Sequence, residues 1–290
     1  MDGSAAPLPG SSAKLRVAGL RGADHRARVS YEARLEPSVA GVIGAPAASS
    51  WRTVEALLPV RVLARSRTTE TAVVRLADGT RIVRKRWTWP RRRDRLKGAL
   101  RTTFAARSPA RREFDALVRL ASLPGGGFAP APRGWLEHRE RGVLRACTLL
   151  LDEVPQAVDL AEWLCAEGAS AQRQAVLSRL AERLRTMHDA GLADFEMHPR
   201  NVLVGAGGRV LKVDCAKQRR RTGSASRIDR VRDLAAVDVG LARLAAAERD
   251  GFLRAYLGAA ATAAGLASLD AAVSAERRRI DARESRRLPR

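Results

Sequence analysis

The chain has few of the residues that mark several common classes of protein. Its 290 residues include only three cysteines, Cys147, Cys165 and Cys215, and their spacing fits neither a metal site nor a disulfide framework. Aromatic residues make up 4%, and no recognisable nucleic-acid motif accompanies them. We therefore expect neither a disulfide-stabilised protein nor a nucleic-acid-binding module, and a reducing compartment fits best.

Long hydrophobic runs are also missing. The longest apolar stretches, residues 147–151 and the alanine-rich residues 258–267, are too short or too weakly apolar to span a bilayer. The first residues lack a basic region followed by an apolar core, so no signal peptide is expected. These features predict a cytoplasmic protein whose only membrane contact is peripheral, at the inner face.

Acidic residues are scarce relative to basic ones. Lys and Arg number 53 against 31 Asp and Glu, which gives a formal net charge of +22. A bias toward arginine codons is an alternative explanation, but it accounts for the ratio of Arg to Lys and not for the excess over acids. The charge therefore indicates an anionic partner such as a nucleotide, a nucleic acid or a phosphate-rich membrane surface.

The composition and the hydrophobic pattern of the sequence change near residue 51. Residues 1–50 are rich in Ala, Gly, Ser and Pro without a sustained period, which predicts a flexible or peripheral N-terminal segment. Alternating β-branched residues then predict five strands, over 60–64, 71–76, 81–87, 134–138 and 143–154. Asp78-Gly79 predicts a hairpin between the second and third strands, and Ser108-Pro109 predicts the start of a helix.

After Pro155 the pattern becomes helical. Helices are expected over residues 160–166, 169–190 and 228–283, with a small hairpin formed by 202–204 and 210–213. The sequence therefore predicts a two-lobed α+β fold. Residues 51–154 would form an N-lobe of antiparallel sheet plus helix, and residues 155–290 a mostly helical C-lobe.

Five polar residues fall at informative places in this layout: Lys85, Glu113, Glu196, Asn201 and Asp214. Phosphoryl transfer from ATP needs a cation on the α/β-phosphates, a carboxylate that fixes it, two oxygen ligands for Mg²⁺ and a carboxylate that orients the attacking hydroxyl. Lys85 and Glu113 can supply the first two groups. Asn201 and Asp214 can hold the metal, and Glu196 can act as the base, which predicts an ATP- and Mg²⁺-dependent phosphotransferase.

The order and spacing of these residues resemble the protein-kinase-like superfamily. Five positions separate Glu196 from Asn201 and thirteen separate Asn201 from Asp214, as in that superfamily. Within it, the chain looks like the lipopolysaccharide-core kinases that phosphorylate heptose or Kdo. The segments that carry this likeness are 85–87, the basic run 91–97, 110–114, 128–132, 187–191 and 232–234, and the resemblance covers roughly residues 61–244.

The resemblance implies a protein-kinase-like fold, ATP and Mg²⁺ as cofactors, and a sugar hydroxyl of the lipopolysaccharide core or a related glycolipid as acceptor. It also places His198 near the γ-phosphate and makes Asp233 a residue that braces the catalytic loop. His188 is expected to pack or cap at a helix end. Trp87 and Trp89 either stack on a sugar, lie at a bilayer interface or pack against the lobe.

Several residues depart from the family pattern. The catalytic Asp of the family falls on Glu196, which is one methylene longer, and Asp194 stands where the family has His, so Asp194 is a second candidate for the base. Residues 66–70 contain no Gly for a phosphate-covering loop, and Cys215-Ala216 follow Asp214. These departures leave a catalytically silent kinase-like regulator as an alternative.

The segment after Asp214 bears on the acceptor. Asp233 follows after only nineteen positions, and no Ala-Pro-Glu-like end of an activation segment is present. This favours a small or membrane-borne acceptor, with an atypical protein kinase as the other alternative. The basic stretches 81–101 and 217–232 flank the predicted ATP site in sequence and suit an anionic sugar or glycolipid, although individual arginines are as readily explained as solvated helix faces.

Overall fold

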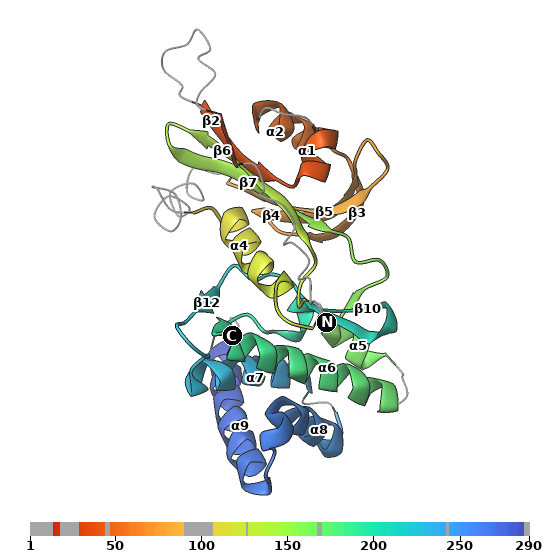
Figure 1. The fold of residues 1–290 in the computed structure, drawn as a ribbon, viewed down its shortest axis with the longest axis vertical. Coiled ribbons are helices and arrows are strands. Elements are labelled where there is room, and N and C mark those ends of the chain that lie inside the picture. The colour runs from red at the N-terminus through yellow and green to blue at the C-terminus, as the bar shows by residue number, and fades with distance from the viewer. Residues whose placement is uncertain are drawn as a thin grey trace, which may run out of the picture. The chain divides into compact units, whose positions relative to one another are not determined.

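A computed structural model describes residues 14–17, 29–43, 47–89, 107–125, 127–166, 170–241 and 244–286 (Figure 1). The predicted basic run 91–97 lies outside these residues. The chain divides into two compact units, and each is made of two separate stretches. The sheet unit comprises Met1–Phe114 and Pro132–Glu153, and the helical unit comprises Asp115–Ala131 and Val154–Arg290.

The sheet unit is built on one antiparallel sheet of seven strands, in the order β1-β2-β6-β7-β5-β4-β3. All five predicted strands are present, and each lies within a few residues of its expected bounds. Asp78 and Gly79 form the expected turn, in which Asp78 Oδ1 accepts the N–H of Thr80 (2.9 Å) and Gly79 has a φ of 86°. The strands are β1 Lys14–Val17, β2 Val29–Leu35, β3 Pro59–Arg65, β4 Thr69–Arg75, β5 Arg81–Thr88, β6 Pro132–Glu140 and β7 Val143–Asp152.

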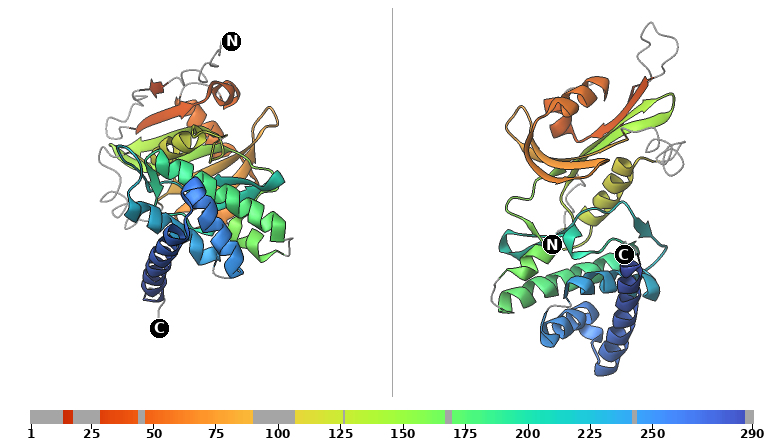
Figure 2. Two further views of the ribbon diagram at one scale, coloured as in Figure 1. Left: turned by 60° about the horizontal axis from the view of Figure 1, so that its bottom comes forward. Right: turned by 180° about the vertical axis from the view of Figure 1, so that it is seen from behind.

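The N-terminal segment contributes more to this unit than its composition predicts. Strand β2 and helix α1 (Pro37–Ile43) belong to what was expected to be flexible or peripheral, and helix α2 (Ala47–Ala56) begins there. Both helices lie over one face of the sheet (Figures 1 and 2), where Leu35, Val39 and Ile43 are buried in the same core as Ile82 and Leu150. The prediction for this segment was therefore wrong, because Val39 and Ile43 are one helical turn apart and the surrounding Ala, Gly and Ser residues obscure that spacing.

Two pairs of packed helices make up most of the helical unit. Helix α6 packs against α8, and α7 packs against α9. The apolar stripe of α6 includes Leu177, Leu180, Leu184 and Met187, and all four are fully buried. The single helical region expected over 228–283 is three helices. The helices are α5 Leu160–Cys165, α6 Ser170–Asp189, α7 Arg227–Leu241, α8 Ala246–Leu257 and α9 Ala263–Ser285; α4, Pro109–Ala121, has its last residues in this unit.

Short strands in the helical unit flank the segments that carry Glu196, Asn201 and Asp214. Strand β10 pairs with β11 and β8, and β12 pairs with β9, all antiparallel. The 3-10 helix η2 (Pro199–Asn201) leads into β10. The strands are β8 Val158–Asp159, β9 Leu192–Asp194, β10 Val202–Gly205, β11 Arg209–Lys212 and β12 Gln218–Arg220. The predicted fold class, an antiparallel sheet with a helix followed by a mostly helical part, is confirmed.

Within the described ranges, no helix combines the length and apolar character needed to cross a membrane.

Candidate active site

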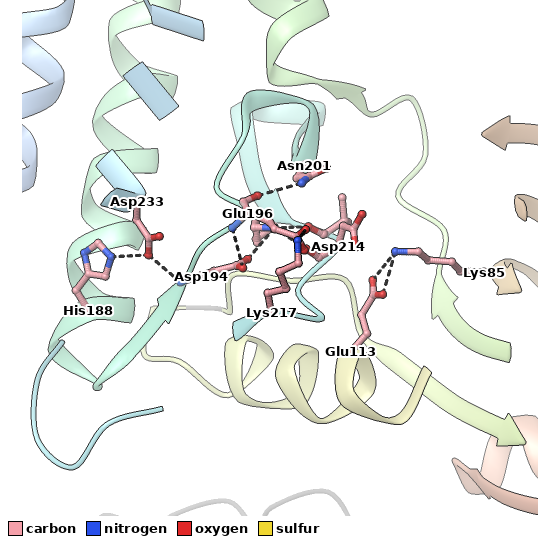
Figure 3. A network of polar contacts seen from close by, with 11 residues as sticks. Lys85, Glu113, His188, Asp194, Glu196, Asn201, Asp214, Lys217 and Asp233 are labelled. Carbon is pink, nitrogen blue, oxygen red and sulfur yellow. Dashed lines mark hydrogen bonds and ion pairs between the residues drawn. The ribbon is translucent and has the colours of Figure 1, made fainter. Parts of the chain in front are cut away.

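Lys85 and Glu113 form a tight ion pair in the sheet unit. The Lys85 ammonium donates to both oxygens of the Glu113 carboxylate, at 3.0 and 2.9 Å (Figure 3). The Glu113 side chain is 1% exposed and that of Lys85 12%. The ammonium also lies 5.1 Å from the centre of the Trp87 ring. A buried carboxylate therefore fixes the position of the Lys85 ammonium.

Strand alternation explains why Lys85, and not its neighbour, holds this position. Successive side chains of a strand point to opposite faces of the sheet. Arg84 points the other way and donates to the carbonyl oxygens of Val54 and Leu57, at 2.8 and 2.9 Å. Sequence reasoning gave Arg84 no role, and the structure makes it a brace for the end of helix α2.

The loop before β10 carries Glu196, the carboxylate that was predicted to act as the base. Asn201 Nδ2 donates to the backbone oxygen of Glu196 (3.0 Å), which leaves the Asn201 side-chain oxygen as an acceptor. The N–H of Val213 donates to the backbone oxygen of Asn201 (2.9 Å) and so ties this loop to the segment that carries Asp214. Lys217 Nζ lies 2.5 Å from Glu196 Oε1. Lys217 was predicted only as part of the basic stretch 217–232, and nothing in the sequence distinguishes it from the other basic residues there.

Asp214 follows β11 in an uncommon backbone conformation. Its φ is 56°, in the left-handed region that few residues other than Gly adopt. Such conformations concentrate at functional sites, where the surrounding contacts hold them. The Lys212 ammonium donates to the Asp214 backbone oxygen at 3.0 Å, which is one such contact.

Behind the loop, Asp233 and His188 form a buried polar cluster with Tyr256. Asp233 Oδ2 accepts the N–H of Asp194 (2.8 Å) and lies 3.1 Å from His188 Nε2 (Figure 3). His188 Nδ1 lies 2.8 Å from the Tyr256 hydroxyl. Burial lowers the pKa of His188 to about 3, so the ring is neutral, and burial also raises the pKa of Asp233 well above its usual range. Asp233 thus contacts the backbone at the end of β9, immediately before the loop that it was predicted to brace.

Asp194 does not fit the alternative role of base. Its side chain is fully buried and lies 2.8 Å from the ammonium of Lys212, which is also fully buried. A base must reach the acceptor hydroxyl, whereas the Asp194 carboxylate is paired with Lys212 in the interior of the helical unit. Sequence reasoning missed Lys212, although a lysine between Leu211 and Val213 in an apolar strand was a usable signal.

His198 caps the 3-10 helix that precedes Asn201. Its Nδ1 accepts the N–H of Arg200 at 3.2 Å. His198 and Arg200 also border a recess of about 720 Å³ formed by α5, η2 and α7. The other residues that line it include Asp159, Glu162, Cys165 and Gly240.

Residues 56–256 match the model of the lipopolysaccharide kinase (Kdo/WaaP) family. The chain belongs to this family. It is therefore a kinase, a phosphotransferase that acts on an alcohol group, and membership implies ATP as the phosphoryl donor. A comparison with curated proteins found no match to the chain.

Two residues of this kinase could hold a magnesium ion that is shared with phosphate. Mg²⁺ typically takes one or two protein oxygens and completes its shell with phosphate oxygens and water. Asn201 and Asp214 offer an amide oxygen and a carboxylate. Among the described residues, no group of three His, Cys, Asp or Glu side chains could hold a metal ion without such help.

Proposed function

We propose that this kinase transfers the γ-phosphoryl group of ATP to a sugar hydroxyl of the lipopolysaccharide core or of a related glycolipid. The observation that carries the proposal is the bidentate Lys85–Glu113 ion pair in a chain of this family. A carboxylate that holds the lysine by both oxygens leaves the ammonium oriented for the α- and β-phosphates. A surface lysine would need no such partner.

The roles of the remaining residues follow from their contacts. Asn201 and Asp214 would hold Mg²⁺, which neutralises phosphate charge when bound. Glu196 orients the acceptor hydroxyl and takes its proton while the hydroxyl oxygen bonds to the γ-phosphorus. The bond from that phosphorus to the β–γ bridging oxygen breaks, and ADP leaves. Lys217 holds the Glu196 carboxylate at 2.5 Å before the acceptor arrives.

The recess beside the catalytic loop is the proposed acceptor site. It lies against His198 and Arg200, which are close in sequence to Glu196 and Asn201. Arg200 is exposed, and in the described part of the chain no carboxylate pairs with it. An arginine can bind the carboxylate or phosphate groups of an anionic sugar. Glu162 and Asp159 can accept hydrogen bonds from sugar hydroxyls.

Phosphate transfer from radiolabelled ATP to a lipopolysaccharide extract, compared with casein, tests the proposal. We expect transfer to the extract alone, and Lys85→Ala and Asp214→Ala should each reduce it by orders of magnitude. Transfer to casein alone would make the chain an atypical protein kinase. Absence of transfer, with no Mg²⁺-ATP thermal shift, would favour the silent regulator.

The acceptor site needs a separate measurement. Arg200→Gln should raise the KM for the glycolipid and leave the KM for ATP unchanged. Arg254→Gln, an exposed arginine on α8, is the matched control and should change neither. An unchanged glycolipid KM in Arg200→Gln would remove the recess from the proposal.

A further inference from the structure

Asp194 and Lys212 form the one ion pair of the described residues in which a lysine and a carboxylate are both fully buried. Their closest charged atoms, Nζ and Oδ2, are 2.8 Å apart. Removing two charges from water is costly, and apolar residues of similar volume often stabilise a fold as well or better. The pair therefore requires an explanation other than stability alone.

Each partner also contacts the backbone of a segment that the proposed reaction uses. The Lys212 ammonium donates to the backbone oxygens of Val213 (2.5 Å) and Asp214 (3.0 Å). Asp194 Oδ1 accepts the N–H of Glu196 at 3.2 Å. The ion pair thus joins the backbone at the proposed base to the backbone at the proposed metal ligand.

The two partners come from different small sheets of the helical unit. Asp194 ends β9, which pairs with β12, and Lys212 ends β11, which pairs with β10. The backbone of Asp214 has a φ of 56°, a conformation that surrounding contacts must maintain. The ammonium of Lys212 supplies a contact at that residue, so the pair links one sheet to the strained backbone that follows the other.

We infer that Asp194 and Lys212 are a positioning pair that sets Asp214, and with it the bound metal, relative to Glu196. This inference rests on the proposed function, since it concerns the same site. Neither residue touches the reacting atoms. Their effect is on where the metal ligand and the base lie, and displacements of about 1 Å can cost on the order of 100-fold in rate.

The experiment separates positioning from folding by a double substitution. Asp194→Asn and Lys212→Met each leave one buried charge without its partner, so each should lower the denaturant midpoint. The double variant Asp194→Asn/Lys212→Met has no buried charge and should recover most of that loss. We expect its kcat to stay about 100-fold below wild type. Its affinity for Mn²⁺, measured by electron paramagnetic resonance with a non-hydrolysable ATP analogue, should also stay weakened.

A second ion pair of the helical unit provides the control. Arg249 Nε, in α8, lies 2.5 Å from Asp238 Oδ1, in α7, and the other polar partners of this pair, Arg277, Asp270 and Ser274, all lie in α9. Asp238→Asn/Arg249→Met should change stability but neither kcat nor Mn²⁺ affinity.

Three results would overturn the inference: a double variant with wild-type kcat, one with wild-type Mn²⁺ affinity, or one that cannot fold, since stability would then explain the pair. The wild-type protein is measured first. If it neither binds nucleotide nor transfers phosphate, the proposed function fails and not the positioning role alone.

Discussion

Glu196, the predicted base, carries its carboxylate one methylene group farther from the backbone than an aspartate would. The longer side chain is held at its end by Lys217, 2.5 Å away, and at its backbone by Asn201 and Asp194. Lys217 is itself well exposed, so the pair contributes little to stability. Its proposed role is to fix the position of the Glu196 carboxylate before the acceptor binds.

Replacing Glu196 tests its assignment as base. Glu196→Gln should lower kcat for phosphate transfer by about 10²–10⁴-fold, because the amide cannot take the proton of the hydroxyl. Binding of Mg²⁺-ATP, followed by thermal shift, should be unaffected because Glu196 is not a proposed nucleotide ligand. Undiminished turnover in this variant would rule out the assignment.

The three cysteines should differ sharply in reactivity. Burial raises the pKa of Cys147 to about 12, so it remains a thiol at pH 8, and Cys215 is fully buried. Cys165 is exposed and lines the proposed acceptor recess. We expect a bulky maleimide at pH 8 to label Cys165 first and to inhibit transfer to glycolipid, with no effect on nucleotide binding. The Cys165→Ser variant should keep its activity after the same treatment; rapid inhibition of that variant would place the sensitive thiol elsewhere.

Most elements could be predicted from the sequence because their signals are local. Strand alternation, Asp78-Gly79 and Ser108-Pro109 depend on a few adjacent residues, and Ser108 Oγ does accept the N–H of Arg111 at 3.1 Å. Strand β2 and helix α1 were missed because their apolar residues are few and lie among small ones. Their burial depends on Ile82 and Leu150, which are remote in sequence.

The candidate site, like the fold, could be predicted only where the signals are local. Lys85, Glu113, Glu196, Asn201 and Asp214 could be proposed from order and spacing alone. Lys212 could not be assigned a role because its partner, Asp194, is eighteen positions earlier and their strands belong to different sheets. Contacts of this kind depend on tertiary structure, which no local pattern encodes.

The turn between α6 and β9 should be sensitive to a single methyl group. Gly191 has a φ of 76°, and a Cβ there would overlap the backbone oxygens of Gly223 and Arg221. Gly191→Ala should cost about 1–2 kcal/mol from the left-handed conformation and about 1–3 kcal/mol more from the overlap. Comparing the denaturant midpoints of Gly191→Ala and the wild type measures this loss of stability.

Gly207 is the matched control for this prediction. Its φ is 66°, but nothing lies within 4 Å of the place that a methyl group would occupy. Gly207→Ala should therefore show only the conformational cost, about 1–2 kcal/mol. Equal losses in the two variants would mean that the turn before β9 adapts to the methyl group.

At the scale of the whole molecule, the net charge of +22 should act on the acceptor. Charges separated by more than about 10 Å are screened at 0.1 M salt, so long-range attraction is strong only in dilute buffer. We expect the KM for phosphorylated glycolipid to rise several-fold as salt increases from about 0.05 to 0.5 M. The KM for a dephosphorylated extract should change less. Parallel increases for both acceptors would show that the charge does not serve acceptor binding.

The chain passes back and forth between its two units. Residues Asp115–Ala131 belong to the helical unit but stand between two stretches of the sheet unit. Phe128, within them, is fully buried and its backbone oxygen accepts the N–H of Lys212 at 2.8 Å. Neither unit is thus an unbroken length of polypeptide. A fragment that begins near residue 154 would lack Phe128, and with it a buried side chain and a backbone acceptor of its own unit.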